Sequence, residues 1–173
     1  MGSFARKDIM RLFIAILFEE SIIDALTHFQ DGLKAKGVKG NYSRRENLHI
    51  TLAFIGEYGN PDEVMDAIEQ VDFKPFDIRL EGVGHFGDLF WVGIEDNPEL
   101  KGYVKRLRRA LSDNRIPFDR KKFSPHITLI RKAVSADGRA IPVVDAPNGE
   151  MRVARISLMK SERGKNGMVY TEM

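Results

Sequence analysis

His49-Ile50-Thr51-Leu52 recurs without a change as His126-Ile127-Thr128-Leu129. We call these two stretches the first motif and the second motif. Residues two apart on a β-strand point to the same face, so each copy directs its His and Thr to one side and its Ile and Leu to the other. The repeat therefore predicts two strands, each with one buried apolar face and one face that presents an imidazole and a hydroxyl.

The segments around the motifs show both strand and helix patterns. Short apolar or alternating runs predict strands, two of them paired as a hairpin, and apolar residues three and four apart predict helices. Asn60-Pro61 and Asn97-Pro98 are typical helix starts, and Gly37 is a typical helix stop. The expected strands are 11–18, 49–55, 76–80, 89–94, 126–130, 152–161 and 167–171, and the expected helices are 20–36, one that starts at Pro61 and one that starts at Pro98.

Glycine-rich segments predict the connections between these elements. Residues 56–59 are expected to turn the chain, residues 82–87 to join the two strands of the hairpin, and the region of Gly164 to join the last two strands. Residues 133–150 are rich in Gly, Pro, Asp and Ala and predict a surface loop, with a short extended piece at 141–144. Because hairpins are antiparallel, we predict an α+β fold with antiparallel sheets.

No linker divides the chain, so we expect a single two-lobed domain of residues 10–173. Residues 1–9 show no clear structural pattern and are interpreted as an N-terminal extension or a cloning remnant. No apolar run is long enough to span a membrane, and no export signal precedes residue 10. We therefore expect a cytoplasmic protein without membrane contact, and a monomer.

Composition restricts the possible chemistry. The chain has 173 residues, a net charge of +2 and no cysteine, which excludes disulfides, thiolate metal sites and cysteine nucleophiles. This charge suits an anionic ligand of modest size. It is too small for a protein that coats long stretches of duplex, where many phosphates must be neutralised.

The two motif histidines are the strongest candidates for catalysis. One strand histidine is commonly a satisfied polar residue, but the two motifs contain two of only four histidines, and packing does not require them there. His28 and His85 belong to no motif. Two histidines without a neighbouring carboxylate–histidine cluster are too few ligands for a catalytic zinc site, and no phosphate-binding glycine loop is present. We predict neither a metal nor a cofactor.

These motifs resemble those of the 2H phosphoesterase superfamily, and most closely its RNA 2′,3′-cyclic phosphodiesterases, also called 2′-5′ RNA ligases. The resemblance covers nearly all of residues 10–173. Beyond the two motifs it includes Arg11–Ala15, Glu46–Leu48, Trp91–Gly93, Pro125 and Ser161–Glu162. It implies two pseudo-symmetric lobes whose antiparallel sheets face a central cleft, with helices packed outside and one motif in each lobe.

The resemblance also implies catalytic roles. It makes His49 the proton donor to the leaving ribose oxygen and His126 the base that activates water. The residues alone do not decide which histidine is the acid and which is the base. Free imidazole has a pKa near ~6.5, so one ring can be neutral while the other is protonated. Thr51 and Thr128 are placed to donate hydrogen bonds to phosphate oxygens, where charge builds in the transition state.

Two further residues are candidates for substrate binding. Arg131 matches an arginine that often follows the second motif in the family and would stabilise phosphate charge. Strand alternation instead puts Ile130 beside the motif histidine, so Arg131 reaches the site only at a strand end, a twist or a bulge. Phe13 is a candidate for stacking on a base, with burial in the core as the alternative.

The resemblance thus implies metal-independent hydrolysis of RNA 2′,3′-cyclic phosphate ends, and of cyclic nucleotides, to 2′-phosphomonoesters. The expected partners are RNA 3′ ends or nucleotides that bear a 2′,3′-cyclic phosphate. Two alternatives stay open: a module of the same fold that binds AMP-like nucleotides without turnover, and a 2′-5′ RNA ligase that runs the reverse reaction. The sequence does not identify the physiological RNA or a base preference.

Overall fold

The structure is a computed structural model that describes residues 10–138, 141 and 145–173. No helix in this part of the chain is long and apolar enough to cross a membrane. The elements are β1 (Met10–Leu17), α2 (Glu20–Ala35), β2 (Lys39–Tyr42), the 3₁₀ turn η1 (Arg45–Asn47), β3 (His49–Tyr58), α3 (Pro61–Glu69), β4 (Phe76–Phe86), β5 (Leu89–Ile94), α4 (Pro98–Asp113), β6 (His126–Val134), β7 (Glu150–Val153), β8 (Ser157–Gly164) and β9 (Gly167–Glu172).

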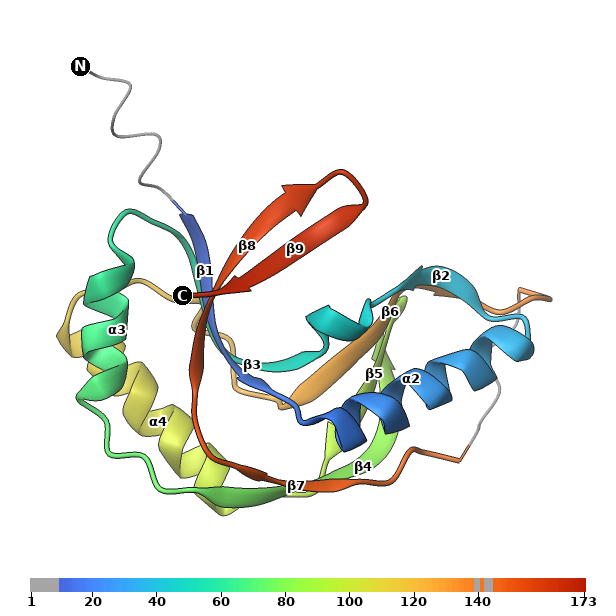
Figure 1. The fold of residues 1–173 in the computed structure, drawn as a ribbon, viewed down its shortest axis with the longest axis horizontal. Coiled ribbons are helices and arrows are strands. Elements are labelled where there is room, and N and C mark those ends of the chain that lie inside the picture. The colour runs from blue at the N-terminus through green and yellow to red at the C-terminus, as the bar shows by residue number, and fades with distance from the viewer. Residues whose placement is uncertain (1–9, 139–140, 142–144) are drawn as a thin grey trace.

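Two antiparallel sheets form the centre of the molecule (Figure 1). The first sheet has the strand order β3-β1-β8-β9, and the second has the order β2-β6-β5-β4-β7. The first motif begins β3 and the second begins β6, so each sheet contains one motif. The predicted α+β fold, with two antiparallel sheets and helices outside, is confirmed.

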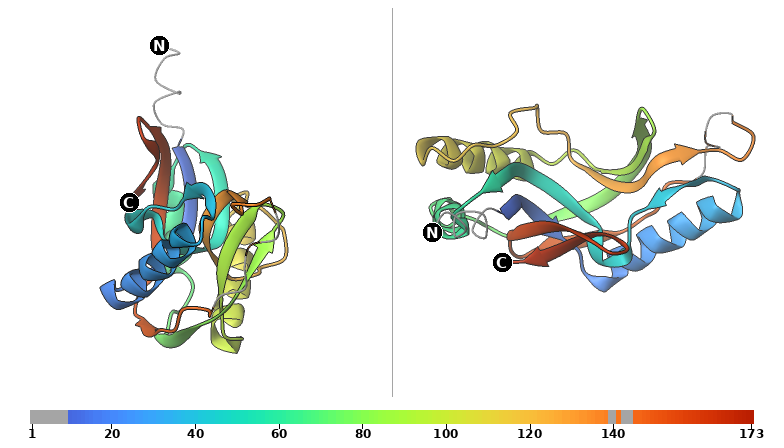
Figure 2. Two further views of the ribbon diagram at one scale, coloured as in Figure 1. Left: turned by 90° about the vertical axis from the view of Figure 1, so that its right-hand side faces the viewer. Right: turned by 90° about the horizontal axis from the view of Figure 1, so that it is seen from above.

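The helices lie at opposite ends of the molecule, with α2 at one end and α3 and α4 at the other (Figure 1 and the right view of Figure 2). Helix α2 packs on the second sheet, where Phe29 stacks on Phe90 of β5 with ring centroids 6.3 Å apart. Helices α3 and α4 contact each other, and α4 also contacts β3. Each sheet therefore has one face turned toward helices and one face turned away from them.

One continuous hydrophobic core joins both sheets and includes the apolar residues of both motifs. Ile50 and Leu52 of the first motif and Ile127 and Leu129 of the second are 0% exposed, as the alternation predicts. Burial of each such side chain stabilises the fold by about 1.5–3 kcal/mol. The core therefore fixes the orientation of each motif strand and turns its His and Thr away from the helices.

The helix ends follow the predicted chemistry. Asn60 Oδ1 accepts a hydrogen bond from the Asp62 amide at 3.2 Å, and Asn97 Oδ1 accepts one from the Leu100 amide at 3.0 Å. These bonds satisfy amides that have no partner within the helix. Just after the C-terminal end of α2, Gly37 has a φ of +83°, a conformation that glycine adopts without steric cost.

The prediction that residues 82–87 form a connection was wrong, because most of them belong to β4, which ends at Phe86. Gly84, in the middle of this segment, serves cross-strand packing. A Cβ atom on Gly84 would lie 2.4 Å from Cζ2 of Trp91, so only glycine leaves room for the indole ring on the neighbouring strand. The predicted pairing of this strand with β5 is confirmed.

Other strand bounds also differ from the predictions. The expected single strand 152–161 is two strands, since β7 pairs with β4 in the second sheet and β8 pairs with β1 in the first. Strand β3 continues into the expected turn at 56–59 and ends at Tyr58, and β6 continues past the expected end at Ile130 to Val134. Strand β2 was not predicted, because its four residues lack an apolar alternation.

The expected turn near Gly164 is confirmed, since Gly164 pairs with Gly167 at the end of the β8–β9 hairpin. Of the expected extended piece at 141–144, residues 142–144 lie outside the described residues.

Candidate active site

Each motif ends in a β-bulge. Leu52 of β3 has no partner residue in the register with β1, and Leu129 of β6 has none in the register with β5. The bulges leave two consecutive residues buried in each strand, Leu52 with Ala53 and Leu129 with Ile130, all at most 1% exposed. An extra residue in one strand shifts the alternation of everything after it by one position.

The bulge in β6 brings Arg131 to the face of His126 and Thr128. Simple alternation would have put Ile130 there, but Ile130 is buried in the core. Arg131 lines a cavity of 600 Å³ together with His49 and Thr128. The bulge at Leu129 is therefore the strand irregularity that places Arg131 on the face of the second motif. His49 of the first sheet and Thr128 and Arg131 of the second line one cavity.

Residues of β2, η1 and the start of β9 form the rest of the cavity wall. Arg44 Nη2 and Asn47 Nδ2 both donate to the carbonyl oxygen of Met168, at 3.0 Å and 2.9 Å. These bonds attach the β8–β9 hairpin to η1 directly before the first motif.

Both motif histidines are held through Nδ1. His49 Nδ1 lies 2.6 Å from the carbonyl oxygen of Asn47, and His126 Nδ1 lies 2.7 Å from the carbonyl oxygen of Ser124. Because a carbonyl oxygen only accepts, Nδ1 carries a proton in both rings. Nε2 of each ring is therefore the atom that can take up or release a proton.

Two aromatic rings pack against His49. The ring centroid of Phe13 lies 4.9 Å from that of His49, and the centroid of Tyr170 lies 5.4 Å from it. Phe13 is only 3% exposed, so it has no free face for a nucleobase. The structure thus favours the buried alternative for Phe13, whose ring supports His49. Tyr170, which we did not predict, lines the cavity.

The environment of His126 is built in a similar way from other strands. Phe86 of β4 lies 5.2 Å from the His126 ring, edge to face, and Trp91 of β5 lies 6.3 Å from it. Phe86 keeps 48% of its surface exposed, which is unusual for so large an apolar side chain. Neither ring was predicted from the sequence as a neighbour of the histidine. An aromatic residue inside a glycine-rich segment was the available signal for Phe86.

Burial lowers the pKa of His49, and the positive charges of Arg131 and His126 act in the same direction, while the hydrogen bond to Asn47 opposes them. Thr51 Oγ1 lies 2.9 Å from His49 Nε2. With Nδ1 protonated and the ring neutral, the Thr51 hydroxyl donates to Nε2. The protein without a ligand thus favours the neutral state of His49, which by itself suits a base rather than the implied proton donor.

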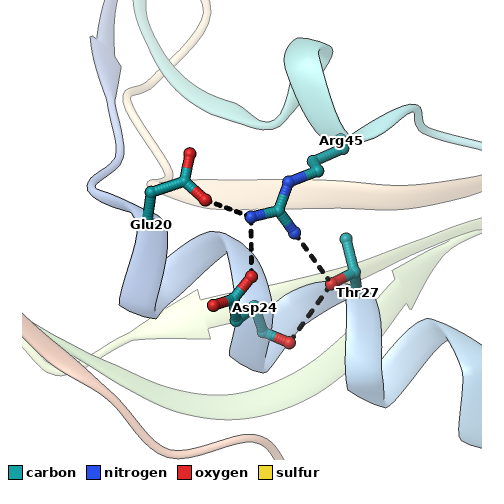
Figure 3. A network of polar contacts seen from close by, with 4 residues as sticks. All are labelled: Glu20, Asp24, Thr27 and Arg45. Atoms are coloured by element: carbon teal, nitrogen blue, oxygen red, sulfur yellow. Dashed lines mark hydrogen bonds and ion pairs between the residues drawn. The ribbon is translucent and has the colours of Figure 1, made fainter.

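A polar network fixes η1, which precedes the first motif, against α2 (Figure 3). Arg45 Nη2 pairs with the carboxylates of Glu20 and Asp24, and Arg45 Nη1 donates to Thr27 Oγ1 at 3.5 Å. Exposed ion pairs add little to stability. The network instead restricts where η1 lies, and η1 supplies the Asn47 carbonyl that orients His49.

The remaining histidines lie apart from the motifs. His28 is exposed on α2, and His85 is exposed with its Nδ1 3.2 Å from the Gly87 carbonyl oxygen. Among the residues that the structure describes, no three His, Asp or Glu side chains form a group able to hold a metal ion.

Comparisons with known proteins agree with this architecture. The sequence profile of the 2′-5′ RNA ligase superfamily matches residues 18–165. An RNA 2′,3′-cyclic phosphodiesterase of Methanocaldococcus jannaschii is 31% identical and aligns with 93% of this chain and 96% of its own length. One of Methanothermobacter thermautotrophicus is 30% identical over 95% of this chain and 96% of its own length. The crystal structure of Escherichia coli LigT in its apo form superposes with a TM-score of 0.81 at 23% identity, covering 96% of this chain and 95% of that one, which supports the fold.

Proposed function

The chain belongs to the 2′-5′ RNA ligase superfamily, and on this premise we propose that it hydrolyses RNA 2′,3′-cyclic phosphate ends and cyclic nucleotides to 2′-phosphomonoesters. Two relatives that match almost end to end are named RNA 2′,3′-cyclic phosphodiesterases. The main structural support is the cavity that His49 shares with Thr128 and Arg131 of the other motif. In both motif histidines a carbonyl oxygen holds Nδ1, so Nε2 is the nitrogen that can transfer a proton, and in His49 it lies 2.9 Å from Thr51 Oγ1.

The reaction needs a base and an acid on opposite sides of the phosphorus, because attack is in line with the leaving oxygen. His126 Nε2 takes a proton from water, and the water oxygen forms a bond to phosphorus. The bond between phosphorus and the ribose 3′ oxygen breaks, and His49 gives its Nε2 proton to that oxygen. Thr51, Thr128 and Arg131 stabilise the charge that builds on the non-bridging phosphate oxygens.

This scheme requires His49 to be protonated when substrate is bound, although its pKa is lowered in the protein alone. A phosphate diester carries one negative charge, which stabilises a nearby imidazolium and opposes the positive charge of Arg131. We therefore propose that His49 takes up its proton as the substrate binds. The assignment of His49 as acid then depends on the bound phosphate rather than on the empty cavity.

The function is tested by incubating the protein with 2′,3′-cyclic AMP and with a cyclic-phosphate-terminated RNA in EDTA, and by identifying the products with phosphorus NMR. We expect the 2′-phosphate alone, and a bell-shaped dependence of rate on pH from two opposed titrations. A 3′-phosphate product would mean that the ring binds the other way round, and the donor and acceptor assignments would lose their basis. Complete loss of activity in EDTA, restored by zinc or manganese, would overturn the two-histidine mechanism.

The same experiment separates the alternatives. Binding of nucleotide without any turnover would identify a binding module. Ligation is the transesterification in which a 5′-hydroxyl, in place of water, attacks the cyclic phosphate and leaves a 2′-5′ linkage and a free 3′-hydroxyl. A 5′-hydroxyl RNA added to the assay measures it directly, and we expect hydrolysis to dominate in water.

A further inference from the structure

Gln30 and Arg108 occupy equivalent places in the two lobes. Each lies ten residues after the first residue of a 16-residue helix, Glu20 in α2 and Pro98 in α4. Gln30 is only 4% exposed although its side chain is an amide. A buried amide destabilises a fold unless hydrogen bonds compensate for the water it has lost, so its partners indicate why it is there.

The Gln30 side chain joins the two motifs. Its Nε2 donates to the carbonyl oxygens of Ser43 at 3.0 Å and Leu129 at 3.1 Å. Ser43 belongs to the segment that leads into the first motif, and Leu129 is the bulge residue of the second. The Ser43 amide also donates to the Leu129 carbonyl, at 2.8 Å.

Arg108 makes the reciprocal connection. Its Nη1 donates to the carbonyl oxygen of Lys121 at 2.7 Å, while Nε and Nη2 donate to that of Leu52 at 3.3 Å and 3.1 Å. Lys121 belongs to the segment that leads into the second motif, and Leu52 is the bulge residue of the first. The guanidinium carbon also lies 5.7 Å and 5.8 Å from the ring centres of Phe118 and Phe123, which restricts its position further.

Both side chains thus bind the carbonyl of a bulge residue, the point at which the strand alternation shifts. Rotation of the Leu129 peptide would turn Arg131 away from Thr128, because Arg131 reaches that face only through the bulge. Rotation of the Leu52 peptide would act on Thr51, the residue before it, whose hydroxyl contacts His49. Neither Gln30 nor Arg108 lines the cavity, so any effect on chemistry must pass through these neighbours.

We propose that Gln30 and Arg108 are a pseudo-symmetric pair of positioning residues that lock the two bulges and hold the two motifs in one geometry across the cavity. Each ties the approach to one motif to the bulge of the other, so a displacement of either bulge from the approach segment bound to it must break these bonds. The catalytic part of this inference rests on the proposed function. The geometric part concerns phosphate binding and is measured without turnover.

Gln30→Met keeps the side-chain length and removes the donor, so it tests the first half of the pair. We compare it with Arg131→Met and the double variant, measuring kcat and KM with 2′,3′-cyclic AMP and the Kd of inorganic phosphate. We expect Gln30→Met alone to lower kcat by roughly 10- to 100-fold, the scale of a small misplacement of catalytic groups, and to weaken phosphate binding.

In the Arg131→Met background, Gln30→Met should change either constant by no more than about twofold, because its effect passes through Arg131. A merely structural role would give the same loss in both backgrounds. Losses that multiply would therefore overturn the proposal.

The second half is tested by Arg108→Met in the wild-type and Thr51→Val backgrounds, with the same expectation of non-additive losses. Arg108→Lys should recover part of the kcat, because an ammonium group still donates to a carbonyl although it lacks the fork geometry. Full additivity with Thr51→Val, together with no recovery by lysine, would exclude a positioning role for Arg108.

Matched controls make the same chemical changes elsewhere. Arg109→Met removes a neighbouring exposed cation from α4, and Gln70→Met removes an exposed amide that hydrogen-bonds Asn114. Both should retain the wild-type kcat and phosphate Kd. An equal loss in either control would show that the assay reports general perturbation and would refute the inference.

Two outcomes need separate readouts. If the wild type does not turn over 2′,3′-cyclic AMP, the proposed function fails. If Gln30→Met binds inorganic phosphate with the wild-type Kd, this inference fails. If Gln30→Met does not fold by circular dichroism, Gln30→Asn replaces it in the same cycle, because asparagine keeps the amide but shortens its reach by one methylene.

Discussion

Replacing Arg131 with methionine removes a guanidinium from the cavity while preserving most of the side-chain length. Arg131 lines the cavity with His49 and Thr128, where the phosphate of the proposed substrate would lie. Loss of one donor to a developing oxyanion costs about 10²- to 10³-fold in rate. Because Arg131 is exposed to solvent, which screens its charge, we expect the lower value, about 100-fold in kcat/KM or ~2.7 kcal/mol.

The same substitution should raise the pKa of His49. Burial is the largest cause of the lowered pKa of this imidazole, and the charge of Arg131 adds to it. Without that charge the imidazolium is less disfavoured, so the pKa moves up, but it stays below its ordinary value because part of the ring remains shielded from water. An NMR titration of the imidazole C–H signals, assigned by comparison with His49→Gln, measures this shift without substrate.

Lys132→Met is the matched control, since it removes an adjacent exposed cation at a position where φ is +55°. It should leave both kcat/KM and the His49 pKa unchanged. Wild-type kcat/KM in Arg131→Met, or a fall of the His49 pKa, would refute the inference that the β6 bulge directs Arg131 into the cavity.

Three further outcomes are expected. His49→Asn and His126→Asn should each abolish hydrolysis of 2′,3′-cyclic AMP and leave the circular dichroism spectrum unchanged, since both rings are only partly buried; retained turnover in either would exclude that histidine. The lowered pKa of His49 should make folding less stable as pH falls below the unfolded value of ~6.5, so the urea midpoint should drop more between pH 7 and 5 in the wild type than in His49→Gln. Ile127→Ala should lower the free energy of unfolding by about 2–5 kcal/mol, because Ile127 is 0% exposed; a smaller loss in urea titration would mean that the core around β6 relaxes.

The sequence predicted the features that depend on local chemistry. The caps at Asn60 and Asn97 act within one helical turn, so a dipeptide with proline is enough to locate them. The alternation of the two motifs was enough to assign the buried faces of β3 and β6. The repeat itself predicted two strands of the same kind, and the resemblance to a known family implied that each belongs to its own lobe.

Features that depend on strand pairing could not be predicted from local sequence patterns. Nothing in residues 152–161 marks the point where the chain leaves one sheet for the other, since only the partners β4 and β1 distinguish β7 from β8. The bulges at Leu52 and Leu129 are also set by neighbouring strands. A pattern of two consecutive apolar residues after Thr was visible in both motifs, but it equally fits a strand that ends there.

The polar residues behind the motifs did leave a signal in the sequence. Gln30 lies four residues after Leu26 and three before Leu33, within the buried stripe of α2. Arg108 lies four residues after Val104 and three before Leu111 in α4. A lone polar side chain at a stripe position must find hydrogen-bond partners in the interior. Reading both helices for such exceptions would have identified the pair without a structure.

The two lobes share a backbone plan but differ at the residue that each bulge turns toward the motif face. Arg131 holds this position after the second motif, and Phe54 holds it after the first. Phe54 packs with Phe13 and Met159 on the first sheet, with the Arg11 guanidinium 5.5 Å from its ring.

A cation therefore follows only one of two identical motifs, and its charge acts on the histidine of the other motif. Two identical imidazoles in symmetric surroundings would have the same pKa, so neither would be favoured as the acid or as the base. A guanidinium in place of an aromatic ring at equivalent positions makes the two surroundings differ while both bulges are retained. In the empty cavity its charge favours neutral His49, so the proposed acid role of His49 depends on the negative charge of the bound phosphate.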